Sequence, residues 1–354
     1  MPLEAKTLPT RRDEAWKWTD VSRSVAGIAR GQDKAAPVQI FVPEGVTVTR
    51  SETRSVANDS RLQKLSTDYA GQLFDITVPA GFSSDQPIQI EGLTQGHAQI
   101  SLKLGKGAKV QLVEHYDGQD GAFVNTHFNI KLEAAALLDR VVVQTDPEDC
   151  VRIATTHITA WADAEIRQHA LAFGGKLSRL ETRFAGMGAD IKATMNGAYL
   201  LNGSRHCDMT SYVDLTCPGS EIRQSVKGVT DDKAKGVFQG KFHVRRPAQH
   251  TDAEMRHDAI MLSDTSEIRS KPELEIYADD VACAHGNTIG ALDESALFYM
   301  RQRGIPKAQA KALLTEAFLA SVFDTLEDDV MRESLIEKMR GWFCLLYTSP
   351  SPRD

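Results

Sequence analysis

The middle of the chain alternates apolar and polar residues in short runs. Between residues 74 and 287, strand-like runs of four to six residues recur, each bounded by Gly, Asp, Ser or Pro. Long helical periodicity is missing between them. This pattern predicts short β-strands joined by turns. The clearest runs are 74–78, 87–90, 100–104, 110–113, 140–143 and 274–277.

A weak internal repeat runs through these strands. A small residue, two positions before an aliphatic residue, opens many of them. The aliphatic members are Val110, Leu137, Ile166, Ile191, Ile222 and Ile268. Their separations are 27, 29, 25, 31 and 46 residues, and the last gap has room for two shorter turns. Such spacings suit the stacked coils of a β-solenoid, with the aliphatic side chains pointing inward. A β-sandwich, whose strands also recur between turns, is the alternative.

The pattern becomes helical from Leu292 onward. Asp293 can cap a helix over 294–303, Gly304 can end it, and Pro306 can open the next helix. The second helix carries an apolar stripe at the i, i+3, i+4 spacing that predicts one buried face. The stripe consists of Ala310, Leu313, Leu314, Ala317, Phe318, Ser321 and Val322.

A third helix is expected over 328–340, ending at Gly341. The residues after it finish in Ser-Pro repeats and look like an appended or artefactual tail, so we leave them out of the fold prediction. The chain therefore divides into a mixed N-terminal segment, a β-solenoid core, a C-terminal helical lobe and an atypical tail. The boundaries are 1–73, 74–287, 288–341 and 342–354.

Composition narrows the class of protein. The 354 residues carry 48 acidic and 41 basic side chains with no long basic run, so we expect no nucleic-acid partner. No apolar run approaches the roughly 18 residues of a membrane span. The first residues are polar and lack the apolar core of a secretion signal. Five scattered cysteines do not form a disulfide framework, so a cytoplasmic protein is expected.

Candidate chemistry gathers near the end of the expected solenoid. Cys283-Ala284-His285 matches half of a Rieske-type cluster signature, but the Cys-x-x-His half is absent from the chain. Four of the ten histidines fall within 43 residues here. Imidazole and thiolate suit iron or copper better than magnesium or calcium. Spacing alone favours a surface position for His243 and His250, and leaves the role of His285 open.

Several ordered motifs then resemble the SufB/SufD family of iron–sulfur cluster assembly scaffold proteins. They occupy 16–20, 237–244, 248–253, 271–281, 283–286 and 297–305. The resemblance implies a mainly β fold: a right-handed parallel β-helix core with a helical N-terminal segment and a C-terminal helical lobe. The coil spacing agrees with that fold.

The same resemblance implies a SufD-like scaffold subunit rather than an enzyme. Such a subunit pairs with SufB through the β-helix and docks the ABC-type ATPase SufC through its C-terminal helices. It holds no tightly bound cofactor alone, and meets a transient iron or iron–sulfur cluster in the complex. Whether it forms a homodimer without SufB is left open. The docking residues expected from the motif are Leu297, Phe298, Tyr299, Arg303 and Gly304.

Two residues distinguish the family's branches. SufB-like chains carry a sulfur-accepting Cys where this chain has His257, so a persulfide acceptor is not expected here. SufD-like chains offer the histidine of Cys-x-His-Gly to the SufB interface, and His285 matches it. We therefore expect His285, with Cys283, to contribute to an iron or nascent-cluster site, and His257 as a secondary candidate. The alternatives are a SufB-like sulfur acceptor and a β-helix polysaccharide lyase or hydrolase. Asn287 departs from the small residue usual after His-Gly.

Overall fold

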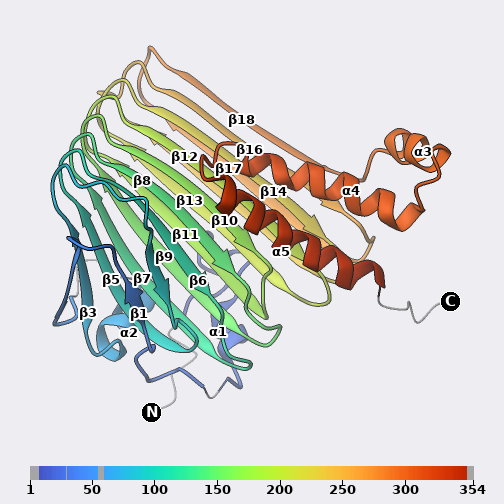
Figure 1. The fold of residues 1–354 in the computed structure, drawn as a ribbon, viewed down its shortest axis with the longest axis horizontal. Helices are drawn as coiled ribbons and strands as arrows, with labels where there is room; N and C mark the ends of the chain where they lie inside the picture. Colours follow the sequence, from blue (N-terminus) through green and yellow to red (C-terminus); the bar gives the residue numbers. More distant parts are fainter. Residues whose placement is uncertain (1–7, 29, 55–59, 349–354) are drawn as a thin grey trace.

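The computed structural model describes residues 8–28, 30–54 and 60–348. Two nine-stranded sheets dominate it and face each other along their whole length (Figure 1). The first sheet is ordered β1 (Gln39–Phe41), β4 (Ile88–Glu91), β6 (Lys109–Tyr116), β8 (Leu137–Gln144), β10 (Glu165–Ala172), β12 (Lys192–Leu201), β14 (Glu221–Thr230), β16 (Asp252–Met261) and β18 (Ala282–Gly290).

The second sheet contains the strands that alternate with these along the chain. Its order is β2 (Thr47–Ser51), β3 (Leu73–Val78), β5 (Gly96–Leu104), β7 (Phe123–Leu132), β9 (Val151–Ala160), β11 (Leu177–Gly186), β13 (His206–Leu215), β15 (Lys235–Val244) and β17 (Glu267–Ile276). From β3 onward the chain crosses from one sheet to the other at every step, and neighbours within each sheet are parallel. Among the described strands, only two pairs are antiparallel, and both lie at the first end of the solenoid: β1 with β4, and β2 with β3. The predicted parallel β-solenoid is confirmed, and the antiparallel sandwich is wrong.

Inward-facing side chains stack in register from coil to coil. On the first sheet, Val110 lies beside Leu138, Leu138 beside Ile166, and Ile166 beside Ala193. The column continues through Ile222, Ala253 and Cys283. Complete burial of one such aliphatic side chain stabilises the fold by roughly 1.5–3 kcal/mol, so the repeated column is a main source of stability.

The predicted inward residues Val110, Ile166, Ile191 and Ile222 are all buried in this core. One other member of the repeat was assigned wrongly. Leu138, and not Leu137, holds the inward position, because Leu138 lies in register with Val110 and Ile166, and the small residue two positions before it is Ala136. Ile268 is buried on β17, in the second sheet. The gap of 46 residues thus spans one full coil and a half.

The C-terminal helices do not form a separate lobe. Helix α4 (Lys307–Ala320), the 3-10 turn η3 (Ser321–Phe323) and helix α5 (Asp329–Thr348) lie across the outer face of the first sheet (Figure 1). Their apolar stripe packs on outward-facing aliphatic residues of the sheet. This cluster, the helix–sheet cluster, includes Val141, Val143, Leu171, Leu200, Val229, Leu319, Val322, Phe323, Leu335, Met339, Trp342 and Phe343. The sequence shows an apolar helix face but not what covers it, and here the solenoid covers it.

Helix α5 also corrects the predicted end of the fold. It passes through Gly341 and continues to Thr348. Glycine inside a helix costs about 1 kcal/mol relative to alanine. Burial of Trp342 and Phe343 in the helix–sheet cluster outweighs that cost. The predicted stop at Gly341 is therefore wrong, and residues 342–348 continue helix α5. Residues 349–354 lie outside the described residues.

The N-terminal segment crosses the outer face of the second sheet. Residues 8–28, which we name the N-terminal strap, contain η2 (Glu14–Trp16) and α1 (Val21–Val25). The strap packs on residues of β7, β9 and β11, together with α2 (Arg61–Tyr69). No helix in the described part of the chain has the length and apolar character needed to cross a membrane.

Candidate functional site

The solenoid ends on two open strands. β17 and β18 are the last members of their sheets, and no strand in the described residues pairs with their outer edges (Figure 1). An unpaired strand edge presents backbone N–H and C=O groups that can pair with another chain. The terminal coil is therefore the part of the solenoid that is incomplete in the isolated chain.

The inward column of β18 carries the candidate chemistry. Cys283, His285 and Asn287 lie in register beside Ala253, Met255 and His257 of β16. The three β16 residues are buried within the solenoid. His285 and Asn287 are exposed, because no further coil covers them. In the preceding coils, the position equivalent to His285 holds a core side chain such as Met255. In the terminal coil, the same position exposes the imidazole of His285.

Cys283 behaves as the last member of the core column. Its side chain is half-buried and packs against the solenoid core. Burial, followed by the nearby carboxylate of Asp252, raises the pKa of the Cys283 thiol. A raised pKa disfavours the thiolate that binds metals. The isolated chain therefore offers His285 more readily than Cys283 to a metal ion.

His257 is fixed inside the solenoid by two hydrogen bonds. Its Nε2 lies 3.0 Å from the hydroxyl of Tyr199, and its Nδ1 lies 3.0 Å from Oδ1 of Asn287. Because an amide oxygen only accepts, Nδ1 donates and Nε2 accepts from the tyrosine. The ring also stacks on Phe238, with centroids 4.9 Å apart. Burial lowers the pKa of His257 to about 4.

Both nitrogens of His257 are thus occupied by the protein. A metal could bind there only after one of the two hydrogen bonds broke. The side chain of His257 thus connects β12, β16 and β18 inside the last coils. This role could not be read from the sequence, because it depends on the register of three strands.

The remaining histidines of the sequence cluster lie apart. His243 is on the outer face of the second sheet, with Nδ1 3.2 Å from both Tyr212 Oη and Asp214 Oδ1. His250 is exposed at a corner, with Nδ1 3.0 Å from Asp280 Oδ2. Within the described residues, no group of three or more His, Cys, Asp or Glu side chains could hold a metal ion.

The predicted docking motif lies on α3 (Glu294–Gln302), which projects from the solenoid (Figure 1). Asp293 caps this helix, as predicted, by accepting from the backbone N–H groups of Ser295 and Ala296. Leu297 is buried, whereas Phe298 is 58% and Tyr299 is 69% exposed. These two rings form an edge-to-face pair with centroids 6.1 Å apart.

The end of the motif is also exposed. Arg303 and Gly304 lie on the surface after α3. Gly304 has φ of +84°, a conformation that favours glycine and ends the helix as predicted. The structure separates the five motif residues into one anchor, Leu297, and four surface positions.

A charged network inside the solenoid was missed by the sequence analysis. Arg140 donates from Nε to Glu114 Oε1 at 2.6 Å and from Nη2 to Thr156 at 2.8 Å. Arg152 donates to both carboxylate oxygens of Asp146, at 2.7 and 2.6 Å. All these side chains are buried. Buried charges require such pairing, and the signal in the sequence was a charged residue at an inward position of a strand.

The sequence is similar to proteins of iron–sulfur cluster assembly. Residues 88–318 match a family model described as SUF system FeS cluster assembly, SufBD core domain. The chain is 26% identical to the iron–sulfur cluster assembly protein SufD of Escherichia coli (strain K12), over 94% of this chain and 88% of that protein.

Two further relatives agree. An iron–sulfur cluster assembly SufBD family protein of Synechocystis sp. is 27% identical, over 92% of this chain and 85% of that protein. SufD of Bacillus subtilis (strain 168) is 33% identical over 109 residues, which are 31% of this chain and 25% of that protein. These matches support the expected family, and none supports a polysaccharide lyase or hydrolase.

Proposed function

The chain belongs to the SufBD family of the SUF iron–sulfur cluster assembly system, and from this premise we propose that it serves as a SufD-like, non-catalytic scaffold subunit in the cytoplasm. Its similarity to SufD over 94% of its length favours the SufD branch. The observation that carries the proposal is the position of His285. An imidazole stands exposed on the open terminal coil, in a column that is otherwise core.

The terminal coil would pair with a SufB-like subunit. β18 is nine residues long and contains no proline, so its backbone donors are all present. β17 contains Pro272, which removes one donor from that strand. We therefore place the main pairing edge on β18. A second copy of the chain would use the same edge when the partner is absent.

Iron or a nascent cluster would be the cargo of this interface. His285 would supply one neutral imidazole nitrogen, and the partner would supply sulfur ligands. The half-buried thiol of Cys283 would remain a core residue unless pairing changes its surroundings. His257 would not be a ligand, because the protein already engages both of its nitrogens.

A SufC-like ATPase would dock on α3. The exposed rings of Phe298 and Tyr299 form an apolar patch on a helix that stands away from the solenoid. Aromatic side chains are favoured anchors of protein interfaces. The apolar faces of α4 and α5 are not available for docking, because the first sheet already covers them.

The test is His285→Ala in the complex reassembled with SufB-like and SufC-like partners. We expect normal assembly and a large loss of iron and sulfide per complex. Thr288→Ala, an exposed position on the same strand, is the matched control and should keep its iron. Weaker assembly with unchanged iron per assembled complex would reduce His285 to an interface contact.

A further inference from the structure

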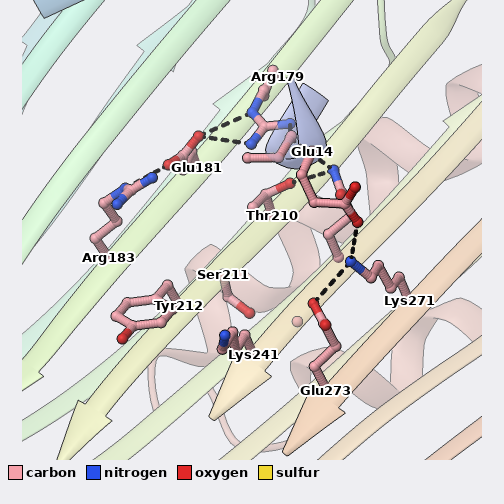
Figure 2. Close-up of a pocket in the computed structure, with 13 residues that line it drawn as sticks. Glu14, Arg179, Glu181, Arg183, Thr210, Ser211, Tyr212, Lys241, Lys271 and Glu273 are labelled. Carbon is pink, nitrogen blue, oxygen red and sulfur yellow. Dashed lines mark hydrogen bonds and ion pairs between the residues drawn. The ribbon is translucent and has the colours of Figure 1, made fainter. Parts of the chain in front are cut away.

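A second site lies on the outer face of the second sheet and reaches its last strand, β17. It is a pocket of about 280 Å³ between β11, β13, β15 and β17, roofed by the N-terminal strap (Figure 2). The short side chain of Thr210 and the buried side chain of Gln239 line the pocket on the side of the sheet. Neither the motifs nor the family match assigns any role to it.

Besides the buried Arg179, three cations from three strands border the pocket: Arg183 of β11, Lys241 of β15 and Lys271 of β17. Figure 2 shows them around the same hollow. Lys271 Nζ is 2.7 Å from Glu14 Oε1 and 3.2 Å from Glu273 Oε2. These ion pairs raise the pKa of Lys271, so this lysine is charged at neutral pH.

The other two cations are also paired. Lys241 Nζ is 2.7 Å from Glu275 Oε1, and this hydrogen bond raises the pKa of Lys241. Arg183 Nε is 2.6 Å from Glu181 Oε1. The Arg183 side chain is 48% exposed, so a ligand in the pocket can reach it.

The carboxylates that occupy these cations differ in how firmly they are held. Glu181 is buried, and Arg179 holds its other oxygen at 2.9 Å. Glu14 is 76% exposed on its side chain, and Glu273 and Glu275 are each more than 40% exposed. Exposed ion pairs contribute little to stability and are screened by salt. The three exposed carboxylates can therefore turn into solvent when another anion arrives.

The floor and roof are rigid by comparison. Arg179 is fully buried, stacks on the ring of Trp16 at 3.9 Å from its centroid, and pairs with Asp208 at 2.7 Å. The carbonyl oxygen of Ala15 accepts from Arg179 at 3.0 Å and from Gln239 at 3.4 Å. This arrangement fixes the strap above the pocket. Only the rim, with its exposed ion pairs, has to change for a ligand to enter.

We propose that this pocket binds a small polyanion carrying two or three phosphate or carboxylate charges. Arg183, Lys241 and Lys271 bind the charges. Glu14, Glu273 and Glu275 act as exchangeable counter-charges that hold the site in its empty state. Because Glu14 belongs to the strap, its release from Lys271 couples ligand binding to the contact between the strap and β17.

The test is calorimetric titration of the full chain with two probes, pyrophosphate and citrate, at low and at moderate salt. We expect one site that weakens as salt rises. Lys241→Gln and Lys271→Gln should each weaken binding about tenfold, as for the loss of one charged hydrogen bond. Glu14→Gln should tighten binding, because it removes a competing carboxylate. The two probes distinguish a phosphate ligand from a carboxylate ligand.

Lys103→Gln is the matched control. Lys103 lies on the outer face of the same sheet, faces Glu133 at 3.7 Å, and is outside the pocket. Its variant should bind both probes like the wild type. The proposal is overturned if neither probe binds at millimolar concentration, if Lys103→Gln weakens binding as much as Lys271→Gln, or if Glu14→Gln weakens it. These titrations measure neither iron loading at His285 nor assembly with partners. A negative result would therefore contradict this inference and leave the proposed function untouched.

Discussion

His257 and Asn287 face each other across the last two strands of the first sheet, with the imidazole Nδ1 3.0 Å from the amide oxygen. The bond links a buried coil to the exposed one. Tyr199 holds the other ring nitrogen from two strands further back. The strand that carries His285 is thus held in place by a chain of hydrogen bonds that begins inside the core.

That chain makes folding stability depend on pH. Burial lowers the pKa of His257 to about 4, whereas the unfolded chain keeps the ordinary value of about 6.5. Between these values the unfolded chain binds more protons. The free energy of unfolding should therefore be constant above pH 6.5, fall as pH drops toward 4, and lose at most about 3 kcal/mol from this residue.

Urea unfolding at pH 7 and pH 5 measures this loss. In His257→Gln the difference between the two pH values should be smaller than in the wild type. An equal difference in the two proteins would show that other groups cause the pH dependence.

The core column should be sensitive to side-chain volume. Ile191 is fully buried, and Ile191→Ala should cost about 2–5 kcal/mol through lost burial and a cavity. The neighbouring Lys192 is exposed, and Lys192→Ala should change stability by less than about 0.5 kcal/mol. Thermal unfolding compares the two. Similar melting temperatures would contradict the inward placement of Ile191.

Tyr199 requires a glycine beside it. A Cβ at Gly228 would lie 1.9 Å from Cζ of Tyr199, so Gly228→Ala should cost about 1–3 kcal/mol through overpacking. The cost should shrink in a Tyr199→Leu background, which a double-mutant cycle of chemical unfolding measures. Gly290→Ala, with no atom within 4 Å of the new Cβ, is the control. Strict additivity of the two changes would refute the contact.

The end of α5 should be part of the fold. Phe343→Ala should lower the unfolding free energy by about 3–5 kcal/mol, because the ring is buried in the helix–sheet cluster. Val330→Ala, at a position 82% exposed on the same helix, should be close to neutral. Chemical unfolding monitored by circular dichroism tests both variants. A neutral Phe343→Ala would return residues 342–348 to the status of a dispensable tail.

Docking of the ATPase should depend on α3 alone. Phe298→Ser and Tyr299→Ser should each weaken binding of a purified SufC-like protein by about tenfold or more, without changing the melting temperature. Val330→Ser removes an exposed apolar side chain elsewhere and should bind normally. Deletion from residue 292 onward is a poor test, since it would also uncover the outer face of the first sheet. Unchanged binding by both α3 variants would move the docking surface elsewhere.

The sequence predicted what repeats locally. The spacing of aliphatic positions favoured the solenoid only together with the family resemblance. The ends of α3 followed from Asp293 and Gly304, because these signals lie within a few residues of the helix ends they specify. The sequence could not show which residues cover the apolar stripe of α4. It also could not show which contacts keep α5 helical through Gly341. Those outcomes depend on Val141, Leu171 and other side chains far away in the chain.

The candidate site was predictable only in part. His285 was chosen from its motif, and the structure shows it exposed on the terminal coil. The grouping of four histidines by sequence distance was misleading. In the solenoid, residues that lie side by side on neighbouring strands of a sheet are about 30 positions apart in the sequence. His257 points into the core, and His243 points out of the opposite sheet. The pocket beside Lys271 had no sequence signal, since its walls come from four strands and the strap.

The position of the open coil also orders events during synthesis. Domains begin to fold from the N-terminal end as the chain leaves the ribosome. The strap emerges first, yet Asp208 and Lys271, which bind it, emerge about 190 and 260 residues later. Among the strands that the structure describes, β17 and β18 are made last. The edge that invites pairing with another chain thus exists only when the rest of the solenoid is ready to support it, which shortens the time in which a half-made chain could associate wrongly.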